Sequence, residues 1–419
     1  MTPFGQQQML NSGIKFFARY QALAEHDNPF VRASGSSRVI MAAQNFTHGF
    51  YRAKSKGLDK KEPYPILILS EAKGQNNTLA HGACPAFEKR PFFGVHLYNK
   101  WAAQFTPSIK QRLNKDLGSK LMSRNIVALM DLCGLATVAH PKGEVSRVCN
   151  LFPREEWKNY NHYYTLSKYY DHGAGHPLGP SQGIGWTNEL IARLTGSPVN
   201  VLGSVNSTLA FDKTTFPLNR KLYADFTHDN DMVAILYAMG LYDTDVPEMA
   251  NGNLNGYNAA TASSFASRMY VEKMNCSVNG RAKTPELVRV LVNDRVVPLR
   301  NCGVDRFGRC TVEKFVKSLS FARSGGNWGD CWSKPPKYPG RPPLHRSPKR
   351  RLGTFDAGAN ITGVQANLTD GMRLTTRFAS EQSVRPVGEC FCEPYKEGEG
   401  NQGVTEGDAI GAARPWQQD

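Results

Sequence analysis

The sequence of 419 residues lacks several patterns that would place it in a class at once. It has no apolar run of about 18 residues or more, so it predicts no membrane span and no membrane partner. The polar pair Thr2-Pro3 follows Met1 where a basic and then apolar leader would stand, and we therefore expect no secretion signal within this chain. No stretch interleaves Lys and Arg with aromatic residues, and no helix-turn-helix pattern occurs, so we expect no nucleic-acid partner. The net charge of +15 suits an anionic partner or a solvated basic surface, and charge alone does not choose between them.

The nine cysteines also lack a pattern, because no two are spaced as CxxC and no His stands at zinc-finger spacing. We therefore expect no metal site, and nothing in the chain indicates a cofactor. Six N-x-S/T sequons occur, at Asn45, Asn76, Asn206, Asn275, Asn360 and Asn367. Together with dispersed cysteines they favour an oxidising compartment in which proteins are glycosylated.

The most informative segment runs from Leu222 to Asn230, Leu-Tyr-Ala-Asp-Phe-Thr-His-Asp-Asn. It predicts a short strand that stops at the pair His228-Asp229. A helical pattern follows at once and ends at Gly240. An imidazole and a carboxyl group are therefore expected at a strand-to-helix turn, where the free N–H groups of the helix start favour an anion.

The rest of the first 332 residues alternates predicted helices with apolar strands. Helices are expected at residues 3–25, 39–53 and 109–134, and further helix within residues 160–193 is interrupted by a glycine-rich loop at 173–185. Strands are expected at residues 30–37 and 64–69. A hairpin is expected around Asn293-Asp294. This alternation predicts an α/β sheet covered on both faces, plus a helical portion.

The composition changes after Trp332. Residues 334–351 contain seven Lys or Arg, six Pro and no acidic residue, as in an extended basic linker, and weakly periodic glycine-rich sequence follows. We predict a folded domain at 1–332 and a largely disordered tail at 333–419. A docking patch for polyanions is the alternative for the basic run.

A second polar turn follows the predicted strand at 30–37. In Phe30-Val31-Arg32-Ala33-Ser34-Gly35-Ser36 an arginine lies near the strand end, where its planar fork of donors can bind a phosphate. Because the ends of strands in open α/β sheets converge on one crevice, we expect Arg32 to meet His228 and Asp229 around a single anion.

These stretches, in unbroken order, resemble the fungal histidine acid phosphatases, and within them the secreted phytases. The resemblance covers about residues 2–332 and includes Thr2-Pro3-Phe4-Gly5, Asn188-Glu189-Leu190-Ile191-Ala192-Arg193-Leu194 and Leu319-Ser320-Phe321-Ala322-Arg323-Ser324-Gly325-Gly326. It implies the phosphoglycerate mutase-like sheet of the histidine phosphatases with helices on both faces, a secreted protein, and a small phosphomonoester as substrate. Phytate is the expected ester, and the resemblance leaves the oligomeric state unknown.

The resemblance also implies roles for individual residues. Arg32 and His228 would bind the phosphate, and Asp229 would protonate the leaving oxygen. Lys168 and Asn230 would contribute to substrate binding. Ser167 stands where phytases often have another lysine, so a general phosphomonoester remains an alternative to phytate.

The chain has no Arg-His-Gly-x-Arg-x-Pro motif, which in this family supplies the histidine that attacks phosphorus. Its nearest imitation, Asp171-His172-Gly173-Ala174-Gly175-His176-Pro177, replaces both arginines, and His81-Gly82 has no following arginine. We therefore predict no turnover by this chain. The alternative function is a non-catalytic remnant that binds phosphate or inositol phosphates.

The family pattern places the missing motif before Met1, so we expect a late start, an absent first strand, and a natural end near Trp332. The disulfide pairing that the resemblance implies is Cys84–Cys331, Cys133–Cys149 and Cys302–Cys310. It leaves Cys276 unpaired and gives Cys390 and Cys392 no partners.

Overall fold

The computed structural model describes residues 1–56, 64–242, 256–275, 285–299 and 301–337. Three expectations lie outside these ranges: the tail beyond Lys337, the unpaired state of Cys276, and the sequons at Asn360 and Asn367. The division of the chain at residue 332 therefore stays a prediction.

Three parallel strands form the first sheet, in the order β2-β1-β3. They are β1 (Phe30–Ser34), β2 (Ile66–Leu69) and β3 (Tyr223–Phe226). Helix α3 (Ser37–Lys54) covers one face, where Val31 and Ala33 pack against it. Helices α8 (Ile184–Thr195) and α10 (Asp229–Ala238) contribute to the core on the other face. The expected α/β class with helices on both faces is thus confirmed.

The second sheet is antiparallel and contains β4 (Met269–Met274), β5 (Leu287–Val292), β6 (Arg295–Val297) and β7 (Cys310–Thr311). The predicted hairpin joins β5 to β6. Asn293 and Asp294 at its turn have φ angles of 49° and 66°, the left-handed conformation that a tight two-residue turn requires.

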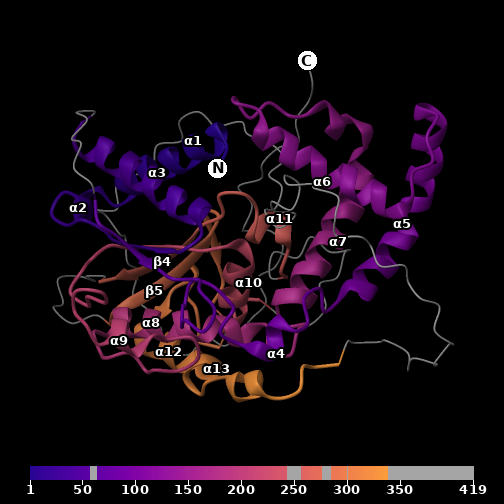
Figure 1. The fold of residues 1–419 in the computed structure, drawn as a ribbon. Helices are drawn as coiled ribbons and strands as arrows, with labels where there is room; N and C mark the ends of the chain where they lie inside the picture. The colour runs from indigo at the N-terminus through magenta and orange to yellow at the C-terminus, as the bar shows by residue number, and fades with distance from the viewer. Residues whose placement is uncertain (57–63, 243–255, 276–284, 300, 338–419) are drawn as a thin grey trace.

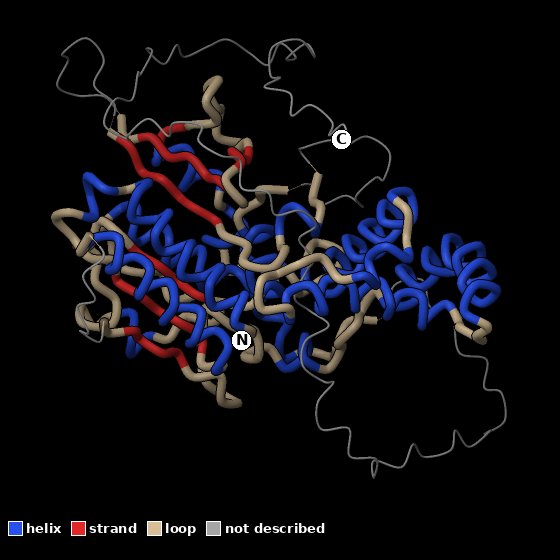
Figure 2. The backbone as a smooth tube through the Cα atoms, turned by 90° about the horizontal axis from the view of Figure 1, so that it is seen from above, coloured by secondary structure: helices blue, strands red, loops and turns tan. Residues whose placement is uncertain are grey.

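The expected helical portion lies to one side of both sheets (Figure 1). Seen from above, the strands gather in one half of the molecule and most of the other half is helical (Figure 2). Its main helices are α5 (Val95–Leu117), α6 (Ser123–Ala139) and α7 (Arg154–His172). The predicted helical range 109–134 is helical except for a break between α5 and α6, because Gly118 adopts a φ of 58° and ends α5 there.

Helix α1 (Pro3–Arg19) packs lengthwise on α3. As expected, Thr2 caps it, since its hydroxyl accepts a hydrogen bond from the Gly5 N–H at 3.1 Å. The predicted helix at 3–25 is interrupted at Tyr20, after which the short helix α2 (Gln21–Ala24) follows.

The remaining elements are short helices that connect or cover the larger ones. They are α4 (Pro85–Glu88), α9 (Ser207–Ala210), α11 (Ala259–Ala262), α12 (Val312–Ser318), α13 (Ser320–Arg323), and the 3-10 turns η1 (Arg147–Leu151), η2 (Pro180–Gly183) and η3 (Trp328–Trp332). Within the described ranges, no helix combines the length and the apolar character needed to cross a membrane.

Three disulfides cross-link the described residues, and they join the pairs that the resemblance implied: Cys84–Cys331, Cys133–Cys149 and Cys302–Cys310. The first of them joins cysteines 247 residues apart and so ties the end of the described chain to the loop before α4.

Each sheet has an edge strand, β3 in the first and β4 in the second, that faces the other sheet without pairing with it in the described residues. Strand β3 pairs only with β1, and β4 only with β5. Both edges line the same cavity of about 1460 Å³, together with side chains of α1, α3 and α8. The two sheets therefore face each other across an open space instead of forming one continuous sheet.

Candidate active site

The carboxyl ends of β1 and β3 bring the candidate residues together. These strands run parallel, with Arg32 opposite Asp225 and Ala33 opposite Phe226. The chain leaves β1 into α3, whose second residue is Arg38, and leaves β3 into α10, which His228 precedes as its N-cap residue. Arg38, His228 and Asp229 consequently line the same end of the large cavity.

His228 is held from both sides of its ring. Its Nδ1 lies 3.1 Å from Nη2 of Arg38, and its Nε2 lies 2.9 Å from Oε1 of Glu71. An arginine can only donate hydrogen bonds, so Nδ1 must be the acceptor. His228 is therefore a neutral imidazole that carries its proton on Nε2 and donates it to Glu71.

Asp229 is the first residue of α10, where the helix dipole stabilises its negative charge. The ammonium group of Lys168 contacts Oδ2 of Asp229 and lies 2.6 Å from Oδ1 of Asn230. Lys168 is buried on α7, with 4% of its side chain exposed. Lys168 therefore binds the Asp229 carboxylate and the Asn230 amide oxygen together, and the predicted role of Lys168 and Asn230 in substrate binding stays a prediction.

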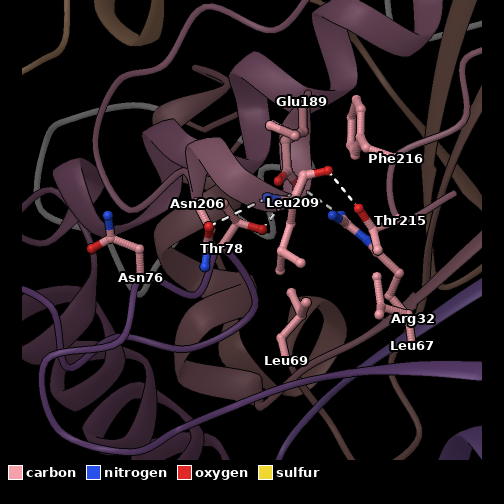
Figure 3. Close-up of a pocket in the computed structure, with 11 residues that line it drawn as sticks. Arg32, Leu67, Leu69, Asn76, Thr78, Glu189, Asn206, Leu209, Thr215 and Phe216 are labelled. Atoms are coloured by element: carbon pink, nitrogen blue, oxygen red, sulfur yellow. Dashed lines mark hydrogen bonds and ion pairs between the residues drawn. The ribbon is translucent and has the colours of Figure 1, made fainter. Parts of the chain in front are cut away.

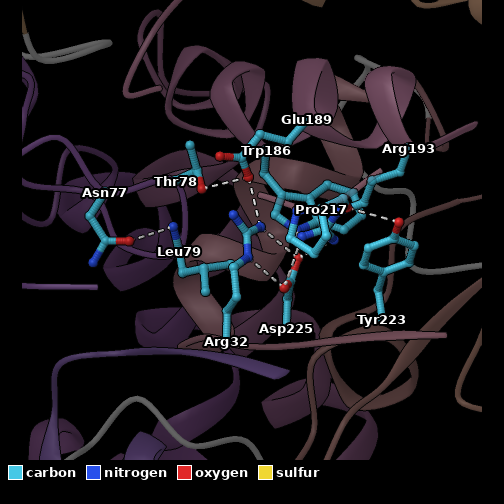
Figure 4. Close-up of polar contacts among 10 residues, drawn as sticks. All are labelled: Arg32, Asn77, Thr78, Leu79, Trp186, Glu189, Arg193, Pro217, Tyr223 and Asp225. Atoms are coloured by element: carbon cyan, nitrogen blue, oxygen red, sulfur yellow. Dashed lines mark hydrogen bonds and ion pairs between the residues drawn. The ribbon is translucent and has the colours of Figure 1, made fainter. Parts of the chain in front are cut away.

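Arg32 lies elsewhere, contrary to expectation. Its guanidinium is buried against Asp225, with an Nε–Oδ1 distance of 2.8 Å, and against Glu189, with an Nη2–Oε2 distance of 2.7 Å (Figure 4). Alternation along β1 explains this placement, because Val31 and Ala33 face α3 and Arg32 must therefore face α8. Arg32 does not meet His228, and the arginine that contacts His228 is Arg38.

The cluster around Arg32 is internally neutralised. Arg193 also binds Asp225, at 2.7 Å, and the indole N–H of Trp186 donates to the same carboxylate at 2.9 Å. Burial opposes the ionisation of Asp225, but the charges of Arg193 and Arg32 hold its pKa far below the ordinary range. These charges stabilise the sheet–helix interface and leave none in excess for a ligand.

A small cavity beside Arg32 does not change this conclusion. It is lined by residues that include Thr78, Glu189 and Thr215 (Figure 3). Its volume is about 10 Å³, which is enough for one water molecule and too little for a phosphate ester.

The histidine of the segment 171–177 that could replace the missing nucleophile, His172, has a structural environment. His172 ends α7, and its ring lies 5.8 Å from that of His81 and 5.9 Å from that of Phe87. Burial lowers the pKa of His172 well below its ordinary value, and the nearby charge of Lys168 adds to this effect. The carboxylate of Asp171 accepts hydrogen bonds from the Gly94 N–H and the Tyr98 hydroxyl, so its role is to join α7 to α5.

Two residues of the site, Arg38 and Glu71, were not predicted. Both had a sequence signal, since Arg38 opens the helix after one predicted strand and Glu71 follows the next strand by two residues. In the described part of the chain, no three His, Cys, Asp or Glu side chains form a group that could hold a metal ion.

Comparisons with known proteins identify the family of this chain. The profile described as "Histidine phosphatase superfamily (branch 2)" matches residues 1–293. The chain is 48% identical over 345 residues to Phytase A of Aspergillus oryzae and equally to that of Aspergillus fumigatus, covering 80% of this chain and 73% of each relative.

Among solved structures, the phytase from D. castellii superposes with a TM-score of 0.61 at 19% identity, a similarity that supports the fold alone. The match covers 78% of this chain and 65% of that phytase, so it spans slightly less than two thirds of the solved protein. The profile match and the two fungal relatives together show that this chain belongs to the histidine phosphatase superfamily, branch 2.

Proposed function

We propose that this chain carries the phosphate-binding and proton-donating groups of a histidine acid phosphatase of the phytase type. The observation that carries the proposal is the meeting of Arg38, His228 and Asp229 at one end of a large cavity. Among the described residues Arg38 contacts neutral His228 and has no carboxylate partner, so its charge can balance that of a phosphate.

Each of these groups suits one part of phosphoryl transfer. Arg38 would bind the oxygens on which negative charge spreads in the transition state. His228 would add a hydrogen bond to the same group. Asp229 would protonate the leaving alkoxide oxygen, and to do so it must first exchange its contact with Lys168 for a proton.

Myo-inositol hexakisphosphate is the proposed ester. The support for it is that the fungal relatives are named Phytase A, and the net charge of +15 is compatible with a polyanionic ligand. A general phosphomonoester is the broader alternative. Three disulfides and the exposed side chains of Asn76 and Asn275, each the first residue of a sequon, further support a secreted, glycosylated protein.

The sequence holds no Arg-His-Gly-x-Arg-x-Pro motif, and the buried His172 does not replace it. Without an attacking histidine the covalent step has no nucleophile. We therefore propose that the chain, as given, binds phosphate esters without hydrolysing them.

Calorimetric titration of the full chain with myo-inositol hexakisphosphate tests the binding. We expect binding by the wild type and a loss of about tenfold or more in affinity for Arg38→Ala, because a charge-assisted contact is removed. Arg124→Ala, which removes the same charge from an exposed position on α6, serves as the control and should leave the affinity unchanged. Equal affinity in wild type and Arg38→Ala would place the anion elsewhere.

Release of phosphate from an aryl phosphate at acidic pH tests the missing step. We expect no release above background. Appreciable turnover that persists in a His172→Ala variant would show that the chain contains a nucleophile in another position.

A further inference from the structure

The carboxylate of Glu71 occupies a set of donors that is suited to a phosphate oxygen. Its Oε1 accepts hydrogen bonds from the Ser34 hydroxyl at 2.6 Å, the Ser36 backbone N–H at 3.0 Å and His228 Nε2 at 2.9 Å. A single oxygen with three donors is a common arrangement for a bound oxyanion.

These donors come from separate parts of the fold. Ser34 ends β1, Ser36 precedes α3, and His228 precedes α10, so the residues that precede two helices meet at this oxygen. Arg38 holds the other side of the His228 ring. The site thus stabilises a negative charge, and in this conformation that charge belongs to the carboxylate of Glu71.

We propose that Glu71 is an internal competitor for the substrate phosphate, which an incoming anion must displace from His228 and the Ser36 N–H. This inference rests on the proposed function, since it assigns the donors around His228 to the ligand. Glu71 is then a positioning residue. It fixes the tautomer of His228 while no anion is bound, and it opposes the binding of anions that cannot displace its carboxylate.

Charge arithmetic at the site supports the competition. Arg38 and Lys168 bring two positive charges, Glu71 and Asp229 bring two negative charges, and His228 is neutral. Within this hydrogen-bonded set, the positive and negative charges therefore cancel while Glu71 is ionised. Neutralising Glu71 leaves one positive charge in excess and favours the anion.

Low pH should weaken the competition, because protonation removes the negative charge of Glu71. Burial raises the pKa of Glu71, but the hydrogen bonds from Ser34 and His228 outweigh it and hold the pKa below the ordinary value. The charged and titratable groups near Glu71 are His228 of the α10 start, Arg38 of α3, and His81 from the following loop. Once the pH falls below the lowered pKa of Glu71, this carboxylate gains a proton, and the loss of its negative charge favours an anion.

Binding of inorganic sulfate tests this proposal, because sulfate keeps its charge from neutral to mildly acidic pH. Titrations should compare the full-length wild type with Glu71→Gln, which keeps the shape and an acceptor oxygen but removes the charge. At neutral pH we expect Glu71→Gln to bind sulfate about tenfold more tightly. The difference should persist at mildly acidic pH and shrink only below about pH 4.5, because the lowered pKa keeps Glu71 ionised in the wild type until then.

Two further variants serve as a control and as a second test. Glu144→Gln removes an exposed carboxylate far along the chain and should leave sulfate affinity unchanged. Glu71→Ala should also bind more tightly than the wild type, which a merely structural role of Glu71 does not predict.

Equal or weaker sulfate binding by Glu71→Gln, with clear binding by the wild type, would overturn the competition and leave the proposed function standing. Absence of sulfate binding in every form at either pH would overturn both, because no anion site would then exist at His228.

Discussion

At the scale of single residues, two arginines six positions apart have different roles. Arg32 lies within β1 and is neutralised by Glu189 and Asp225, which are 157 and 193 residues away in the chain. Arg38 opens α3 and reaches His228. Sequence reasoning predicted an arginine at this strand end, but the distant carboxylates that bind Arg32 are visible only in the folded structure.

His81 gives a prediction at the same scale. Burial lowers its pKa, but the charges of Asp231 and Glu88 outweigh burial and raise the pKa to about 9, from an ordinary value of 6.5. The charged form therefore stabilises the fold fully below about pH 6.5, and this contribution is lost as the pH rises through about 9.

We expect the free energy of unfolding to fall by about 1–2 kcal/mol between these two pH values. This is less than the full pKa shift would give, because about a third of the His81 side chain is exposed and solvent screens its charge. Urea unfolding at several pH values measures it. His81→Gln should flatten this part of the profile, whereas His140→Gln, at a more exposed ring, should not. An unchanged slope in His81→Gln would assign the effect to another group.

At the scale of elements, the sequence predicted both α1 and α3 but not how closely they pack. A Cβ added to Gly13 of α1 would lie 2.0 Å from the carbonyl oxygen of Phe46, and one added to Gly49 of α3 would lie 2.0 Å from that of Leu10. The two backbones therefore touch at these glycines, and Phe16, Phe46 and Phe50 fill the interface beside them.

Gly13→Ala tests this contact. Alanine favours an isolated helix by about 0.5–1 kcal/mol over glycine, so helix propensity alone predicts stabilisation. We expect a loss of about 1–3 kcal/mol in the free energy of unfolding instead, because the helices must move apart. Gly329→Ala, where an added Cβ has no neighbour within 4 Å, is the control. Stabilisation by Gly13→Ala in urea unfolding would contradict the close packing.

At the scale of the whole molecule, the space between β3 and β4 is the main departure from a continuous sheet. Backbone N–H and C=O groups on both edges have no strand partner among the described residues, and the cavity walls include apolar side chains such as Phe16, Trp186 and Met232. Unpaired edges of this kind bind strands from other molecules.

We therefore predict that the purified chain associates with rising concentration, which sedimentation velocity will show. Val271→Lys places a charge on β4 inside the cavity and should weaken association. Val296→Lys, at an exposed position on β6, is the matched control and should leave association unchanged. A wild-type chain that stays monomeric at every concentration would contradict the prediction.

The sequence by itself determined the α/β class, the three disulfide pairs through family resemblance, and the placement of His228 and Asp229 at a strand-to-helix turn. These features depend on local periodicity, on turn residues and on ordered motifs, which a linear pattern records. The tertiary structure alone decided that Arg38 and not Arg32 reaches His228, that Lys168 binds Asp229, and that Glu71 accepts a hydrogen bond from His228. Each of these depends on which strands become neighbours and which way a side chain leaves its strand, because charged partners far apart in sequence meet only once the sheet has formed.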